Sequence, residues 1–333
     1  MNISELGEFW PIIQALIVLA VVGIVTIVSV IKFYNVVTCS KFRDSVKMDG
    51  KTVIVTGATG GIGKETAREL AKRGARVILA CRNVENGEKV RAEIQEETKN
   101  DKLVVRELDL SSQKSIRGFA EAIISTEERL DVLVHNAGTA EKNLVKTEDG
   151  LELTMATNHF GPFLLTHLLI DLLKRSAPSR IVVVASSLYQ LASLNLDNLN
   201  PSSSWFPPYI YYPSKYANIC FTLELARRLE GTGVTANCLH PGLIDSGIWR
   251  NVPVPLNWPL KLIVKGFFKT PQQGCQTSLY LTCSDEVKNV SGKYFMECRE
   301  HSLNRGASDM AKAGKLWELS KELTKLKPTD PTI

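Results

Sequence analysis

The chain has 333 residues with a formal net charge of +5, and 44% of its residues are hydrophobic, so it can bury a sizeable core. The charge is modest and no basic stripe with interleaved aromatic side chains occurs, which argues against a nucleic-acid partner. The seven cysteines include no C-x-x-C pair, which indicates reduced thiols and argues against a disulfide framework or a zinc site. We therefore expect no metal.

An uncharged apolar segment occupies residues 10–31, which at about 22 residues suffices for a tilted transmembrane helix in a hydrocarbon core about 30 Å thick. A cleaved signal peptide and a buried core helix are the alternatives. The preceding residues 1–9 contain Glu5 and Glu8 but no basic side chain, unlike a secretory n-region. The segment also lacks an amphipathic face. We therefore expect a membrane anchor, with the lipid bilayer as a partner.

The segment after the apolar run, residues 32–50, is a basic juxtamembrane linker. Because positive residues stay on the cytoplasmic side of a membrane, we expect residues 1–9 to be lumenal and the rest of the chain to be cytoplasmic. The basic residues behind this prediction are Lys32, Lys41, Arg43 and Lys47.

The first predicted strand, Thr52–Thr56, is a β-branched apolar run that a glycine-rich turn follows at once. Gly57, Gly61 and Gly63 are spaced G-x-x-x-G-x-G, and Ile62–Arg73 then has the pattern of a helix. Glycines let the backbone approach a pyrophosphate, and the helix N-terminus offers it N–H groups and a positive dipole end. A lone glycine cluster is usually only a loop, but the strand before it and the helix after it favour a dinucleotide site.

The second predicted strand, Arg76–Cys81, ends without the carboxylate that would bind the ribose hydroxyls of NAD. Arg82 stands there instead, and a guanidinium suits a 2′-phosphate, which favours NADP(H). Lys64 in the phosphate helix adds positive charge nearby. The alternative is that Arg82 is an ordinary surface arginine.

Further strands alternate with long helical patterns, which predicts a Rossmann-type α/β fold, a doubly wound parallel sheet in a single domain at residues 51–305. Ligands in such sheets bind at the carboxyl ends of the strands. Residues 306–333 are a C-terminal helix and tail, with an amphipathic pattern over Ser308–Leu326. The further predicted strands are Leu103–Glu107, Val132–Asn136, Arg180–Ser186 and Val234–His240.

Tyr211 and Lys215 are four residues apart, so on a helix they lie on one face. A free phenol has a pKa of about 10, and shifting it to neutral pH needs about 4 kcal/mol of preferential phenolate stabilisation. A cation one turn away supplies part of that. Taken alone, the pair is also what an amphipathic surface helix would show.

Together these features resemble the short-chain dehydrogenase/reductase family. The matching motifs occur in family order over roughly residues 50–300: TGATGGIG, LDL, HNAG, NHFGPF, SS, YYPSK and HPGLIDS. A narrower resemblance, to the membrane-bound retinol dehydrogenases that act on retinal and related lipid aldehydes, is carried by LACRN, KTPQQGCQTSLY and VSGKYF.

The resemblance implies a role for each catalytic residue. Tyr211 is the general acid/base at the substrate oxygen, and Ser187 hydrogen-bonds that same oxygen, with Ser186 as the alternative serine. Lys215 lowers the tyrosine pKa and holds the nicotinamide ribose, and Asn158 belongs to a proton-relay water chain. A carbonyl that accepts hydride develops negative charge, and hydroxyl donors stabilise it.

The resemblance also implies the NADP(H) contacts. Asp109 approaches the adenine, Asn136 the adenosine ribose, and Ile244 and Ser246 the nicotinamide amide. The histidines beside the motifs (His135, His159 and His240) match no metal spacing and are expected to be structural. The full expected set for the cofactor is Gly57, Thr59, Gly61, Ile62, Gly63, Arg82, Asp109, Asn136, Ala137, Gly138, Tyr211, Lys215, Pro241, Gly242, Ile244 and Ser246.

Two stretches concern the substrate. Asn195–Pro208, between the serine and tyrosine motifs, is turn-rich and must fold aside. Residues 245–270 correspond to a lid in the family, with Trp249, Trp258 and Phe267 as its aromatic residues, which predicts an apolar substrate that enters from the bilayer. The alternative is a helix pair that packs on the core. Thr270 and Pro271 then begin a helix.

The sequence thus predicts a membrane-anchored NADPH-dependent reductase of retinal or related lipid aldehydes and ketones, reversible as an alcohol dehydrogenase. A sterol, an isoprenoid or a fatty aldehyde is the alternative substrate, and a catalytically idle NADP-binding scaffold at a lipid surface is the alternative of another class. The endoplasmic reticulum membrane is the expected location, with the lipid droplet surface and a homodimer left open.

Overall fold

The computed structural model describes residues 3–204, 206–244 and 268–333. Its core is an eight-stranded sheet in the order β3-β2-β1-β4-β5-β6-β7-β8. Strands β1 to β7 pair in parallel, and β8 pairs antiparallel with β7. The strands are β1 (Thr52–Thr56), β2 (Arg76–Cys81), β3 (Leu103–Glu107), β4 (Val132–His135), β5 (Ser179–Val184), β6 (Val234–His240), β7 (Tyr294–Met296) and β8 (Arg299–His301).

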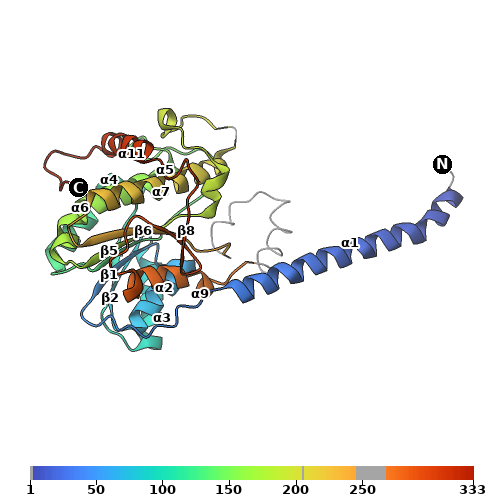
Figure 1. Cartoon of the computed structure of the whole chain (residues 1–333), viewed down its shortest axis with the longest axis horizontal. Coiled ribbons are helices and arrows are strands. Elements are labelled where there is room, and N and C mark those ends of the chain that lie inside the picture. Colours follow the sequence, from blue (N-terminus) through green and yellow to red (C-terminus); the bar gives the residue numbers. More distant parts are fainter. Residues whose placement is uncertain (1–2, 205, 245–267) are drawn as a thin grey trace.

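The helices of the described residues are α1 (Ile3–Thr38), α2 (Gly61–Lys72), α3 (Val84–Thr98), α4 (Gln113–Thr126), α5 (Leu153–Met155), α6 (Gly161–Arg175), α7 (Tyr211–Arg228), α9 (Pro271–Gly274), α10 (Gln276–Cys283) and α11 (Met310–Leu323). Those after α1 lie in two layers around the sheet (Figure 1). Short turns complete the set: η1 (Ala156–Phe160, a π-helical turn), η2 (Ser187–Leu191), η3 (Leu196–Asn198), η4 (Pro207–Ile210) and η6 (Asp285–Val287).

The two layers follow from alternation along the strands, because successive side chains of a strand point to opposite faces. Ile54 of β1 belongs to the core under α4, α6, α7 and α11, whereas Val53 and Val55 belong to the core under α2, α3 and α10. The sheet is therefore buried on both faces, as parallel sheets usually are.

The predicted Rossmann-type fold is confirmed, and the predicted bounds of β1, β2, β3 and β6 are those observed. β5 spans Ser179–Val184 rather than Arg180–Ser186, so the serine pair lies beyond the strand. The β7–β8 hairpin was not predicted, because strands of three residues carry too little alternation to detect. Thr270 caps α9 as expected, through a reciprocal capping box with Gln273.

Helix α1 projects away from the domain (Figure 1). Its segment Trp10–Val30 has a mean hydropathy of 2.7 and buries none of its residues in the rest of the chain. By length and composition this helix can cross a membrane.

Helix α11 packs on α7, and its buried side chains belong to the same core as those of α7. The Trp317 ring is buried and stacks on Phe221 at a centroid distance of 5.9 Å, and the Arg228 guanidinium lies 4.6 Å from the Trp317 ring centroid. His159 Nε2 lies 2.9 Å from Ser320 Oγ, which explains this histidine as a structural residue.

Candidate active site

The predicted functional residues gather at the carboxyl ends of the parallel strands, where ligands bind in open α/β sheets. Gly57 follows β1, Asn136 follows β4, Ser186 comes shortly after β5, and Pro241 follows β6. Tyr211 is the first residue of α7. The parallel register of the sheet brings these residues, far apart in the sequence, to one edge.

The glycine loop is built for close backbone approach. Gly57 has a φ of +67°, and a Cβ on Gly63 would overlap the Gly57 carbonyl oxygen and the Asn136 amide. The Asn136 Nδ2 in turn donates to Thr56 O at 2.9 Å, which holds the loop against the end of β4. Helix α2 then begins at Gly61 without a side-chain cap, so its first N–H groups remain available to a phosphate.

Thr59 and Ile62 are the two other residues of the loop that the sequence predicts to contact the cofactor. Thr59 is half-buried in the turn. The Ile62 and Ile244 side chains both approach Gly274, where a Cβ would lie 3.2 Å from Ile62 Cγ1. The glycine loop and the segment after β6 therefore meet at α9.

Arg82 lies at the end of β2, where the sequence placed it. Its side chain is exposed and makes no ion pair or hydrogen bond with the described residues. Asp109, at the end of β3, is held in place instead: its Oδ1 accepts from Ser111 N at 2.9 Å and from Ser111 Oγ at 2.6 Å. Arg82 thus remains available to an incoming phosphate.

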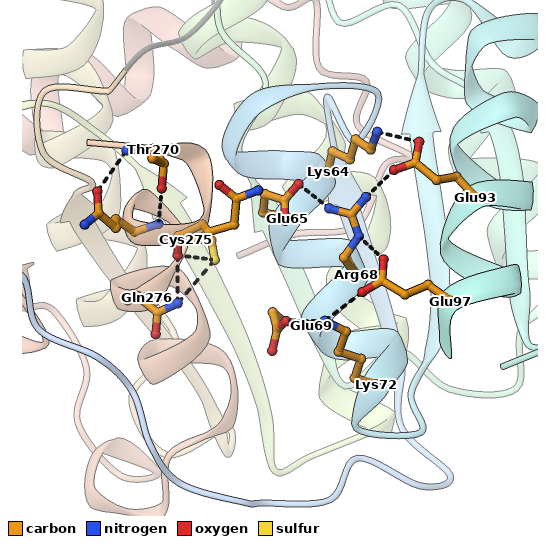
Figure 2. Close-up of polar contacts among 12 residues, drawn as sticks. Lys64, Glu65, Arg68, Glu69, Lys72, Glu93, Glu97, Thr270, Cys275 and Gln276 are labelled. Atoms are coloured by element: carbon orange, nitrogen blue, oxygen red, sulfur yellow. Dashed lines mark hydrogen bonds and ion pairs between the residues drawn. The ribbon is translucent and has the colours of Figure 1, made fainter. Parts of the chain in front are cut away.

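Lys64 is less available to a bound phosphate than its position in the sequence indicates. Its Nζ lies 2.6 Å from Glu93 Oε2, within a network between α2 and α3 centred on the buried Arg68 (Figure 2). Arg68 pairs with Glu65, Glu93 and Glu97. The positive charge expected from Lys64 near the cofactor is therefore largely balanced by a carboxylate.

Asn158 is buried in the π-helical turn η1, a kind of irregularity that is frequent at functional sites. Its Nδ2 donates to Thr139 O and to Ser214 Oγ, each at 2.9 Å, and its Oδ1 accepts from Thr139 N at 2.8 Å. The carboxamide therefore ties the loop after β4 to the first turn of α7.

Lys215 lies beside Asn158 and the loop after β4. A Cβ on Gly138 would be 3.3 Å from both Asn158 Oδ1 and Lys215 Nζ. The buried Nζ donates to Val184 O at 2.8 Å and lies 5.6 Å from the Tyr211 ring centroid. Burial lowers the pKa of Lys215 to about 8, so the ammonium still predominates at neutral pH.

Tyr211 has a higher pKa in this environment than a free phenol. Burial raises the pKa of Tyr211 to about 12, while a hydrogen bond with Ser186 lowers it and the neighbouring Tyr212 raises it. The direction is opposite to the lowering predicted from Lys215, because burial of the phenol outweighs every other influence on it. The phenol is protonated at neutral pH, as a proton donor must be.

The two serines of the pair face different partners. Ser186 Oγ accepts from Leu188 N–H at 3.2 Å and lowers the pKa of Tyr211, whereas Ser187 Oγ lies 3.2 Å from His240 Nε2. The expected role of Ser187 at the substrate oxygen stays a prediction, and Ser186 stays the alternative.

His240 contacts a residue 53 positions away in the chain, a partner that no local spacing in the sequence indicates. Its ring is buried and its Nδ1 has no hydrogen-bond partner among the described residues. Burial lowers the pKa of His240 to about 4, with the charge of Lys269 adding to the effect, so the ring is neutral. No group of His, Cys, Asp or Glu side chains able to hold a metal ion occurs within the described ranges.

The segment after β6 continues the site. Gly242 has a φ of +99° and approaches the Lys269 side chain, where a Cβ would be 2.9 Å from Lys269 Cδ. The buried Ile244 pairs with Lys269 in a parallel bridge. The predicted residues Ser246, Trp249, Trp258 and Phe267 lie outside the described residues.

Comparison with known proteins adds independent findings. A family model described as short chain dehydrogenase matches residues 51–255. Retinol dehydrogenase 14 of Mus musculus is 48% identical over 285 residues, which cover 82% of this chain and 85% of that protein. Retinol dehydrogenase 11 of Homo sapiens is 47% identical over 279 residues, covering 84% and 87%. The RhlG/NADP active-site complex of Pseudomonas aeruginosa has a TM-score of 0.60 at 26% identity, covering 75% of this chain and 95% of that chain.

Proposed function

The chain belongs to the short chain dehydrogenase family and is an oxidoreductase, and on that premise we propose that it is a membrane-anchored, NADP(H)-dependent enzyme that reduces retinal or related lipid aldehydes and ketones. The retinoid substrate is supported by the names of its relatives at 47% and 48% identity. The single observation that carries the chemistry is the meeting of Tyr211 and Lys215 at the carboxyl edge of the sheet.

The cofactor site fits a dinucleotide on the chain's own geometry. The loop at Gly57 and Gly63 excludes side chains, and the uncapped start of α2 supplies N–H groups to phosphates. Arg82 is the residue that would hold a 2′-phosphate, since its guanidinium is exposed and uncompensated by the described residues. When bound, the nicotinamide supplies the hydride.

The protein's own residues handle the proton and the developing charge. Tyr211 donates its proton to the substrate oxygen as negative charge develops there, and a serine hydroxyl of the pair donates a hydrogen bond to the same atom. The Lys215 ammonium stabilises the phenolate that remains after the proton has left.

Membrane attachment is supported by the exposed apolar segment Trp10–Val30. The basic residues after it favour a cytoplasmic catalytic domain. We place the enzyme in the endoplasmic reticulum membrane, with the lipid droplet surface as the alternative. Protease treatment of intact microsomes tests the orientation, because a fully protected catalytic domain would contradict it.

The direct test is turnover of all-trans-retinal with NADPH by the full-length protein in nanodiscs. Tyr211→Phe removes the proton donor, so we expect a loss of about 10²–10⁴-fold in kcat. Unchanged turnover in this variant would overturn the mechanism. Tyr212→Phe is the matched control, since Tyr212 does not stand four residues before Lys215.

Three alternatives are separated by further measurements. A panel of kcat/KM values for retinal, sterol, isoprenoid and fatty aldehydes decides the substrate class. Arg82→Ala should lower the ratio of NADPH to NADH efficiency, and an unchanged ratio would refute the cofactor assignment. Normal cellular function of a Tyr211→Phe, Lys215→Ala double variant would favour an NADP-binding scaffold without turnover.

A further inference from the structure

The chain between α1 and β1 lies against the domain instead of forming a loose linker. Residues 39–48, which we call the strap, adopt neither helix nor strand. The Ser40 backbone N–H donates to Glu297 Oε2 at 3.0 Å, and the Phe42 N–H donates to Gln276 Oε1 at 3.0 Å. These bonds join the strap to the β7–β8 turn and to α10.

A second group of contacts holds the middle of the strap. The Phe42 ring packs edge-on against Tyr280 at a centroid distance of 5.9 Å, and the Arg73 guanidinium lies 5.1 Å from the Phe42 ring centroid. Arg73 Nη1 also donates to Asp44 O at 2.6 Å and to Val46 O at 3.1 Å. One arginine at the end of α2 therefore fastens three points of the strap.

The strap has two faces. Its inward side chains, which are half-buried or buried, are Ser40, Phe42, Val46 and Met48. The exposed side chains of the strap are Lys41, Arg43, Asp44, Ser45 and Lys47. The three basic ones make no ion pair with the described residues. The alternation that is expected of extended chain is interrupted at Asp44 and Ser45, which are both exposed. One face of the strap thus packs on the domain, and the exposed side chains carry three positive charges and one negative charge.

The strap begins close to the end of the apolar span. Eight helical residues separate Val30 from Cys39, and at 1.5 Å per residue they rise about 12 Å. The polar headgroup layer on each side of a bilayer is about 5–8 Å thick. With the apolar segment in the hydrocarbon core and the helix untilted, the strap therefore starts about 4–7 Å beyond the headgroup layer, close to the membrane surface.

We propose that the strap is a lipid-binding surface whose Lys41, Arg43 and Lys47 side chains contact anionic headgroups, while its inner face fixes the domain to the anchor. This rests on the proposed membrane attachment. Each basic side chain near an anionic leaflet strengthens association about fivefold. The partner is an anionic bilayer surface rather than a soluble anion, because the strap is continuous with the membrane-spanning segment.

The start of the strap is also linked to the segment after β6. Glu297, which accepts from Ser40, pairs with Lys269, and the Lys269 N–H donates to Leu243 O at 2.8 Å. Leu243 lies just after β6, in the segment predicted to approach the nicotinamide. The start of the strap therefore lies beside the carboxyl edge of the sheet, where the Tyr211 site is.

Hydrogen–deuterium exchange of the full-length protein tests this surface. We compare strap amides in nanodiscs of phosphatidylcholine alone and of phosphatidylcholine with about one third phosphatidylserine. Anionic lipid should slow exchange at least about threefold, and about 0.5 M NaCl should remove the difference because salt screens exposed charges. Lys41→Gln, Arg43→Gln, Lys47→Gln combined should abolish the response to lipid.

The matched control removes three exposed lysines elsewhere: Lys99→Gln, Lys102→Gln and Lys114→Gln. It should retain the response. Equal exchange in both lipids, or slowing by inorganic phosphate added to phosphatidylcholine discs, would overturn the proposal. Failure of the chain to enter nanodiscs at all would instead refute membrane attachment, which keeps the two proposals distinguishable. Gln276→Ala, which removes the acceptor of the Phe42 N–H, should speed strap exchange in both lipids.

Discussion

We predict that His240 orients the hydroxyl of Ser187 toward the substrate oxygen. A neutral imidazole carries one ring proton, and the Nδ1 atom of His240 has no partner among the described residues. A proton on Nδ1 would leave a buried N–H unpaired, which is rare in native proteins. With the proton on Nε2, the ring donates to Ser187 Oγ at 3.2 Å. The Ser187 hydroxyl hydrogen is then free to donate to a carbonyl oxygen.

The substitution His240→Leu removes this donor while filling similar space. A neutral hydrogen bond contributes about 1 kcal/mol, so losing the orientation of Ser187 should lower kcat about fivefold. Ser187→Ala removes the donor to the substrate oxygen itself and should lower kcat about 10²–10³-fold. The assay is kcat and KM for retinal reduction with NADPH, with thermal melting to confirm that each variant folds.

A double-mutant cycle separates positioning from packing. If His240 acts through Ser187, His240→Leu should have no further effect on kcat in the Ser187→Ala background. His240→Gln, whose amide can donate from a similar place, should restore much of the rate. An undiminished effect of His240→Leu in the double variant would refute the reasoning. A large loss in Ser186→Ala with none in Ser187→Ala would move the catalytic role to Ser186.

Three further predictions concern charge, backbone space and packing. Burial lowers the pKa of Lys215 to about 8, whereas Tyr211 stays protonated up to a pH of about 12. Reduction should therefore lose kcat/KM as the pH rises through about 8, because the Lys215 ammonium loses its proton. A kcat/KM profile that is flat to about pH 10 would contradict this. Gly63→Ala would overlap Gly57 O and should abolish NADPH binding measured by fluorescence titration, whereas Gly118→Ala, which meets no atom within 4 Å, should not. Arg68→Ala leaves the buried Glu65 without its cation and should lower the free energy of unfolding, measured in urea, by about 3 kcal/mol. Lys72→Ala, which breaks a half-exposed ion pair, should lower it by about 0.5 kcal/mol or less. Equal losses would show that burial of the ion pair does not matter.

Local patterns were enough for the fold and for most positions of the site. Strand β1 and the glycine turn after it were predictable because hydrophobic alternation and φ > 0 requirements are written into neighbouring residues. The spacing of Tyr211 and Lys215 has meaning only on a helix, and α7 provides that helix. Arg82 could be placed at the end of β2 because a strand's end follows from its apolar run.

The sequence by itself thus determined the order of the elements, the glycine turn after β1 and the spacing of Tyr211 and Lys215 on one helix, all of which depend on residues within a few positions of one another. Tertiary structure decided the contact of Ser187 with His240 and the pairing of Lys64 with Glu93 across 29 residues. It also decided that the strap docks, through a bond between Ser40 and Glu297, which are 257 residues apart. Such contacts depend on how whole layers pack, and hydrophobic periodicity within one segment does not predict contacts between residues so far apart in the sequence.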